Sequence, residues 1–171
     1  RRGSGLVDPP RCRIGCLIEQ LEHSVAAVAV GVGGELVDSC HEHDCRVMIQ
    51  LTHLGRRAHW NHSDWLPTVS ASRKREAAHR AFPKIIEDWD IERIVADYAL
   101  AAEHMQAAGL DGFELQCYGH LLDQFWSPAT NERDDEWGGS LDNRLRFTDQ
   151  VIDAIRERVG PDFIVGLRLG L

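Results

Sequence analysis

The sequence has few features of a membrane-spanning, secreted or nucleic-acid-binding protein. Its longest apolar run, residues 25–32, is interrupted by Gly31 and falls far short of the roughly 20 residues that span a bilayer. Arg1 and Arg2 are not followed by the apolar core of a signal peptide. With 19 basic and 27 acidic residues, the net charge of −8 disfavours nucleic-acid binding. We therefore expect a cytoplasmic protein with neither a membrane nor a nucleic-acid partner.

The five cysteines are too irregularly spaced for a disulfide framework, so we predict free thiols. Residues 40–45 (CHEHDC) contain several potential zinc ligands. However, His41 and His43 are two residues apart on an expected helix, where they point to different faces. Cys12 and Cys16 resemble half of an iron–sulfur ligand set, but no nearby cysteines complete it. We predict no metal site.

From residue 35 onward, apolar strands alternate with amphipathic helices. Aliphatic runs predict buried strands over 46–51, 112–116 and 163–169. Apolar residues spaced three and four apart predict a helix capped by Asp90 and ending before Gly109, and another over 143–159. A short helix is expected over 35–43. Residues 1–34 show no clear period, and only 26–30 offer a fourth strand.

This order predicts an α/β fold made of right-handed parallel βα units. Two long loops, 52–89 and 117–141, leave the carboxyl ends of predicted strands, which is where such folds carry their chemistry. Gln50 ends the first strand in the run QLTHLGR. Its amide can donate and accept hydrogen bonds at once, which suits the edge of a heterocycle such as isoalloxazine, although a structural role fits equally well.

The second loop carries a longer motif. Residues 121–147 read LLDQFWSPATNERDDEWGGSLDNRLRF. This segment resembles the FMN-dependent oxidoreductases of the old yellow enzyme superfamily, whose pattern has a Q-F-x-S-P run followed by N-x-R-x-D-x-[YW]-G-G-S-x-x-N-R-x-R-F. Gln50 and the pair Gly55-Arg56 match an earlier element of the family, and Arg168 falls where the family has an arginine at the end of its fifth strand.

The resemblance implies a TIM barrel with FMN above the carboxyl ends of its strands. Residues 35–171 would form a partial FMN-binding domain, an incomplete (β/α)8 barrel of three to four βα units, and residues 1–34 a poorly matching N-terminal segment. It also implies that Gln50 binds the pyrimidine side of the flavin and that Arg168 approaches the N1–C2 region. Gly138 and Gly139 would form a tight turn, while three residues hold the loop to the barrel rim: Asn143, Arg144 and Arg146.

One departure points to a branch of the family. Most ene-reductases have a histidine pair here that binds a carbonyl, whereas this chain has Gln116 in place of the first histidine and is one residue shorter. The segment is more similar to the amine-oxidising branch, which includes trimethylamine, dimethylglycine and histamine dehydrogenases. That similarity makes Tyr118 and His120 the candidate catalytic residues. Four aromatic residues could line a cation–π pocket beside Gln116, or simply pack beneath the loops: Trp60, Trp65, Tyr118 and Trp126.

We therefore expect an FMN-dependent oxidoreductase that oxidises an N-methylated or other small amine, with NAD(P)H or an electron-transfer protein as a partner. Two alternatives are an ene-reductase that uses NAD(P)H to reduce α,β-unsaturated carbonyls and a non-catalytic half-barrel fragment. The fragment is considered because a TIM barrel needs eight strands and about 250 residues. An open half-barrel is also expected to be poorly stable by itself.

Overall fold

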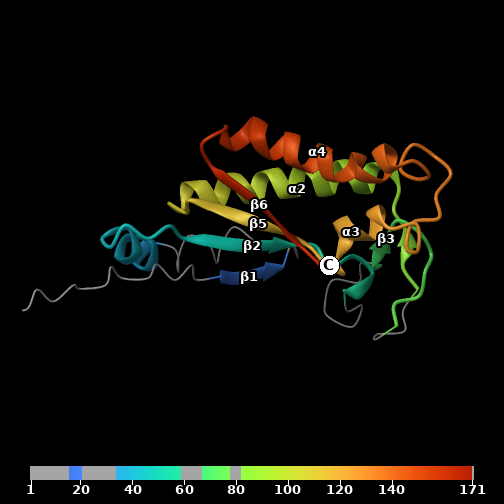
Figure 1. Cartoon of the computed structure of the whole chain (residues 1–171), viewed down its shortest axis with the longest axis horizontal. Helices are drawn as coiled ribbons and strands as arrows, with labels where there is room; N and C mark the ends of the chain where they lie inside the picture. Colours follow the sequence, from blue (N-terminus) through green and yellow to red (C-terminus); the bar gives the residue numbers. More distant parts are fainter. Residues whose placement is uncertain (1–15, 21–33, 59–66, 78–81, 171) are drawn as a thin grey trace, which may run out of the picture.

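The computed structural model describes residues 16–20, 34–58, 67–77 and 82–170. They form a four-stranded parallel sheet in the order β1-β2-β5-β6. Its strands are β1 (Cys16–Gln20), β2 (Met48–Thr52), β5 (Gly112–Cys117) and β6 (Ile164–Leu169). Two long helices, α2 (Asp88–Ala107) and α4 (Leu141–Val159), lie side by side over one face of the sheet (Figure 1). The described helices contain none long and apolar enough to cross a membrane.

The core lies between this sheet and the two helices. Alternate residues of β2 and β5 face the helices, which is the period of two that strands impose. The helices contribute buried residues at spacings of three and four. The buried set comprises Ile49, Leu51, Phe113, Leu115 and Cys117 from the strands, Ile91, Ile94, Tyr98 and Met105 from α2, and Phe147, Val151, Ile155 and Val159 from α4. The intervening residues of the strands therefore face away from the helices, and we call that side the inner face.

Short elements gather at the carboxyl ends of the strands (Figure 1). They are the 3₁₀ helix η1 (Gly55–Arg57), the two-residue strands β3 (Val69–Ser70) and β4 (Lys84–Ile85), and helix α3 (Leu121–Trp126). Helix α3 lies within the stretch that the sequence predicted as loop. It follows β5 directly, and the carboxylate of Asp123 accepts hydrogen bonds from the backbone N–H groups of Gly119 and His120, both at 2.7 Å.

The predicted main elements are confirmed, with shifted boundaries. Strand β2 starts at Met48 rather than at residue 46, because the preceding residues are bound to Asp111. Asp90 is not the N-cap of α2. The N-cap is Glu87, and Asp90 occupies the N3 position of the same capping box, where its carboxylate accepts from the Glu87 N–H. A helix over 34–41 is present, and Gly109 has the positive φ of +85° expected after a helix.

The N-terminal segment contains a strand that the sequence did not predict. Strand β1 pairs in parallel with β2 from Cys16 to Gln20. Residues 26–30, the candidate for a fourth strand, lie outside the described residues. The sheet therefore has four strands, but the first lies upstream of the expected segment.

The glycine-rich loop is attached to the helices as predicted. Arg144 donates to the backbone oxygens of Trp126 at 2.6 Å and Gly139 at 2.5 Å. Asn143 donates to the Gly138 oxygen at 3.0 Å, and Arg146 to the Glu136 oxygen at 2.9 Å. A side chain at Gly138 would collide with the Arg133 carbonyl, so that position requires glycine.

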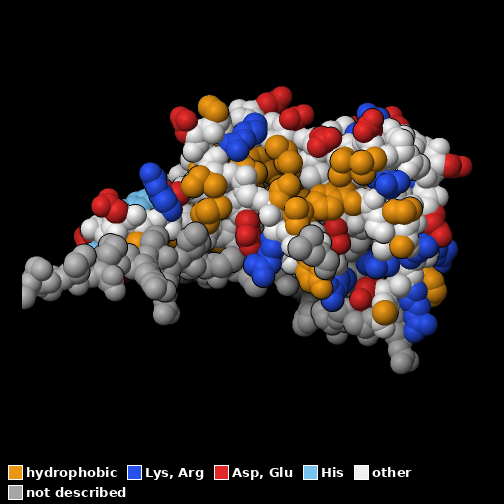
Figure 2. All heavy atoms as spheres, viewed as in Figure 1, with side chains coloured by type: hydrophobic (Ala, Val, Ile, Leu, Met, Phe, Trp, Pro, Cys, Tyr) orange, Lys and Arg blue, Asp and Glu red, His pale blue; other side chains and the backbone are white. Residues whose placement is uncertain are grey.

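Strand β6 is an exposed edge. Hydrophobic side chains gather on the molecular surface along it (Figure 2), and Leu167 and Leu169 are exposed although they face the side that the helices cover elsewhere. In a closed barrel, the next helix and strand cover such positions.

Candidate active site

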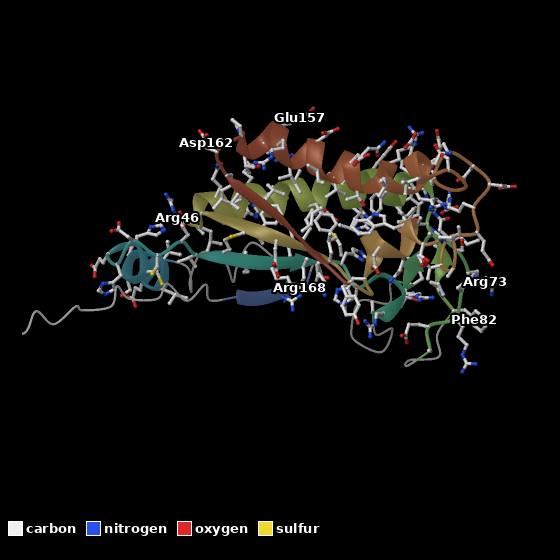
Figure 3. All side chains as sticks on the ribbon, in the orientation of Figure 1. Arg46, Arg73, Phe82, Glu157, Asp162 and Arg168 are labelled. Carbon is white, nitrogen blue, oxygen red and sulfur yellow. The ribbon has the colours of Figure 1, made fainter. Side chains whose placement is uncertain are left out.

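Three side chains from neighbouring strands meet on the inner face. The Gln50 amide nitrogen donates to the Glu114 carboxylate at 2.6 Å, and an Arg168 terminal nitrogen lies 3.4 Å from the same carboxylate oxygen. Gln50 and Glu114 are directly paired across β2 and β5, and Arg168 is two residues beyond the Glu114 partner on β6. Gln50 is only 4% exposed, whereas Arg168 reaches away from the strand into solvent (Figure 3).

This contact fixes the orientation of the Gln50 amide. A carboxylate only accepts hydrogen bonds, so the amide nitrogen must face Glu114 and the amide oxygen must face elsewhere. The Gln50 amide oxygen can therefore accept a hydrogen bond from a ligand. Arg168 is a cation whose counter-ion is the Glu114 carboxylate. Glu114 was not predicted as a site residue, although the alternation of β5 places it on the same face of the strand as Gln116.

Gln116 adds a buried polar atom beside this group. It is paired with Arg168 across β5 and β6, and its buried side-chain oxygen has no hydrogen-bond partner among the described residues. Its amide nitrogen reaches the Tyr118 backbone oxygen at 3.4 Å. Buried polar atoms in native proteins are nearly always paired, so an orphan on the inner face indicates a place where a ligand supplies the partner.

His120 stands at the carboxyl end of the sheet. Its Nδ1 shares a 2.6 Å hydrogen bond with the Thr52 hydroxyl at the end of β2. Burial of the imidazole, together with the positive charge of Arg57, lowers the pKa of His120 below its ordinary value, against the opposing charge of Asp123. Both effects favour the neutral imidazole, the form that can accept a proton.

Tyr118 lies on the same turn. The residue is 59% exposed, and its ring lies against the backbone of Gly170, where an added Cβ would be 2.0 Å from a ring carbon. Tyr118 thus spans from the end of β5 to the end of β6. The residue between Tyr118 and His120 is Gly119, whose φ of +71° favours glycine.

Trp126 lies at the end of α3. Its indole donates to the Thr148 hydroxyl of α4 at 2.7 Å, so it joins the two helices. Trp60 and Trp65 lie outside the described residues. Cys117 faces the helices, and burial raises the pKa of its thiol to about 12. Among the described residues, no group of three or more histidine, cysteine or acidic side chains could hold a metal ion.

The sequence profile of the NADH:flavin oxidoreductase / NADH oxidase family matches residues 33–171. The chain belongs to this family. The expected family resemblance is thereby confirmed.

Three relatives of the chain are named for related reactions. A probable N-methylproline demethylase of Rhizobium meliloti is 63% identical over 134 residues. An N,N-dimethylglycine/sarcosine dehydrogenase of Chromohalobacter salexigens is 48% identical over 135 residues. A multifunctional alkene reductase/demethylase of Caballeronia cordobensis is 46% identical over 134 residues. Each match covers 78% of this chain but only 20% of the relative, so the chain spans about a fifth of the length of these proteins.

A solved structure confirms the fold of the chain. Morphinone reductase in complex with tetrahydroNAD superposes with a TM-score of 0.76 at 31% identity, over 83% of this chain and 43% of that one. The predicted fold class, an incomplete TIM barrel, is therefore correct. The inner face of the sheet is the interior side of that barrel, and its carboxyl end is where TIM-barrel active sites lie.

Proposed function

We propose that the whole protein is an FMN-dependent oxidoreductase that oxidises small N-methylated amines. The observation that carries the proposal is the Tyr118–His120 turn at the carboxyl end of β5. There Thr52 holds His120, whose lowered pKa favours the neutral ring, and the Gln116 oxygen has no partner within the described part of the chain. The names of the two relatives at 63% and 48% identity, an N-methylproline demethylase and a dimethylglycine/sarcosine dehydrogenase, support the same chemistry.

The residues on the inner face fit a flavin. The pyrimidine ring of isoalloxazine has an N–H donor beside carbonyl acceptors, and Gln50 offers an oriented amide oxygen while Arg168 offers a permanent cation. We therefore assign Gln50 and Arg168 to the FMN site. When bound, FMN supplies the two-electron acceptor for the reaction. Residues 35–171 would then form part of the FMN-binding domain.

The substrate-side residues would prepare the amine. A protonated amine has no lone pair, so it must lose a proton before its N–CH₃ group can be oxidised. A neutral His120 can take that proton, and Tyr118 can orient the nitrogen or share the proton. Two-electron oxidation of the N–CH₃ group and addition of water then release formaldehyde and the demethylated amine.

Release of formaldehyde tests this proposal. The FMN-loaded, full-length protein should form one formaldehyde for each N-methylproline or N,N-dimethylglycine consumed. His120→Ala should lower kcat about 100- to 10,000-fold, the usual contribution of a general base. Thr148→Ser, a change at the α4 partner of Trp126, is a matched control outside the site and should leave kcat unchanged. Lack of formaldehyde from every N-methylated amine tested would refute amine oxidation.

Reduction of activated alkenes is the second candidate. It is favoured by the name of the 46% identical relative, a multifunctional alkene reductase/demethylase, and by the structural similarity to morphinone reductase. Cyclohexenone reduction by NADH or NADPH, measured beside formaldehyde release, separates the two activities. Flavin titration of residues 1–171 alone tests the remaining alternative. Lack of flavin binding would support a half-barrel that is not catalytic by itself.

A further inference from the structure

Arg57 is a cation at the mouth of the site that the proposed chemistry does not use. It follows the carboxyl end of β2 within η1, and its side chain is 39% exposed. One of its terminal nitrogens lies so close to Gly119 that an added Cβ would be 2.6 Å away. The guanidinium therefore packs directly on the turn between Tyr118 and His120, and its charge acts on the His120 imidazole.

The neighbouring carboxylates leave the terminal nitrogens of Arg57 available. Glu76 is 3.8 Å away on the Nε side, which is longer than a hydrogen bond. Asp123 accepts from the backbone N–H groups of Gly119 and His120. Among the residues that the structure describes, the terminal nitrogens of Arg57 donate no hydrogen bond. A guanidinium of this kind is suited to a planar, bidentate carboxylate.

We infer that Arg57 binds a substrate carboxylate and so selects N-methylated amino acids over simple alkylamines. This inference rests on the proposed amine oxidation. In an α-amino acid, one carbon separates the nitrogen from the carboxylate, so a site must place its proton acceptor and its anion-binding group close together. Arg57 packs on Gly119, the residue that precedes His120, and its charge acts on the His120 imidazole, so the two groups are neighbours. The two relatives named for N-methylproline and for N,N-dimethylglycine act on substrates of this class.

Binding of two unreactive probes tests the inference apart from turnover. Trimethylglycine carries a quaternary nitrogen and a carboxylate, whereas tetramethylammonium carries the nitrogen alone. Calorimetric titration of the FMN-loaded, full-length protein should give at least 10-fold tighter binding of trimethylglycine. Arg57→Met keeps the apolar stem, and it should weaken trimethylglycine about 10- to 100-fold, the range for a charge-assisted pair. Its affinity for tetramethylammonium should not change.

Two further variants complete the test. Arg57→Lys keeps the charge but lacks the planar guanidinium. Its affinity for trimethylglycine should lie between those of the wild type and Arg57→Met. Arg73→Met removes an exposed arginine at the opposite end of the molecule from Arg46 (Figure 3) and should bind both probes like the wild type. Three outcomes would each overturn the inference. Arg57→Met could weaken the binding of both probes equally, it could leave trimethylglycine binding unchanged, or the wild type could fail to bind trimethylglycine. Lack of formaldehyde release, by contrast, would refute amine oxidation alone.

Discussion

Replacing Asp111 with asparagine tests how the start of the barrel sheet is held together. Its carboxylate accepts from Arg46 at 2.5 Å, from the Val47 N–H at 2.8 Å, and lies 2.8 Å from the His41 ring. Burial by itself would raise the pKa of Asp111, but these three partners outweigh it and lower the pKa from 3.8 to about 2. The side chain is 6% exposed, and it ties residues 41–47 to the start of β5.

The lowered pKa gives the size and the pH dependence of the effect. A difference of nearly two pKa units corresponds to about 2.5 kcal/mol of folding free energy, and the exposure of Arg46 reduces this to roughly 2 kcal/mol. Because the folded pKa is the lower one, this stability is fully present above pH 3.8 and is lost as the pH falls towards 2. Asp111→Asn should therefore cost about 2 kcal/mol at pH 7 and progressively less below pH 4.

Urea unfolding of the chain between pH 7 and pH 3 measures this effect. Asp162→Asn removes the same charge from an exposed site at the same end of the molecule (Figure 3) and should change the free energy of unfolding by less than about 0.5 kcal/mol. A double-mutant cycle with Arg46→Ala isolates the ion pair. Equal effects of the two asparagine variants, or a cost of Asp111→Asn that does not depend on pH, would refute the reasoning.

Three other perturbations follow from described contacts. Asn131→Ala removes a buried amide that donates to two backbone carbonyls at 2.8 Å, and it should cost about 2–3 kcal/mol in urea unfolding. Arg57→Met should raise the pKa of His120, because it removes one of the two effects that lower this pKa, the other being burial. For an amine substrate without a carboxylate, the acidic limb of the plot of rate against pH should therefore move to higher pH. Glu114→Gln leaves the Arg168 charge without its counter-ion, so spectroelectrochemistry should give a more positive flavin midpoint potential.

The long helices and central strands were predictable because their burial patterns are periodic. Helix α4 departs from its prediction by only two residues, since Ser140 caps it and accepts from the Asn143 N–H. The assignment of Asp90 as N-cap failed for a specific reason. Aspartate is a preferred N-cap residue and glutamate is not, so the sequence favours Asp90, whereas in the structure Glu87 is the N-cap and Asp90 occupies N3. Helix α3 spans only six residues, too few for a helical period to be visible.

The candidate site rests on motifs for some residues and on pairing across strands for others, and the sequence offers only the motifs. Gln50 and Arg168 were identified by resemblance, and the structure brings both to Glu114. Glu114 itself is separated from Gln50 by 64 residues, so only the strand register reveals the contact. The hydrogen bond between Thr52 and His120 likewise joins the ends of two strands that the sequence does not align.

The parallel sheet also has a consequence for synthesis on the ribosome. Its strand pairs join residues 32, 64 and 52 positions apart along the chain. Strand β2 can pair with β1 once both have left the ribosome. Its other edge has no partner until β5 is made, 64 residues later. At roughly 5–20 residues per second this takes about 3 to 13 seconds. During that interval the free edge of β2 is open to strands of other nascent chains, which makes this the step at which a chaperone would act.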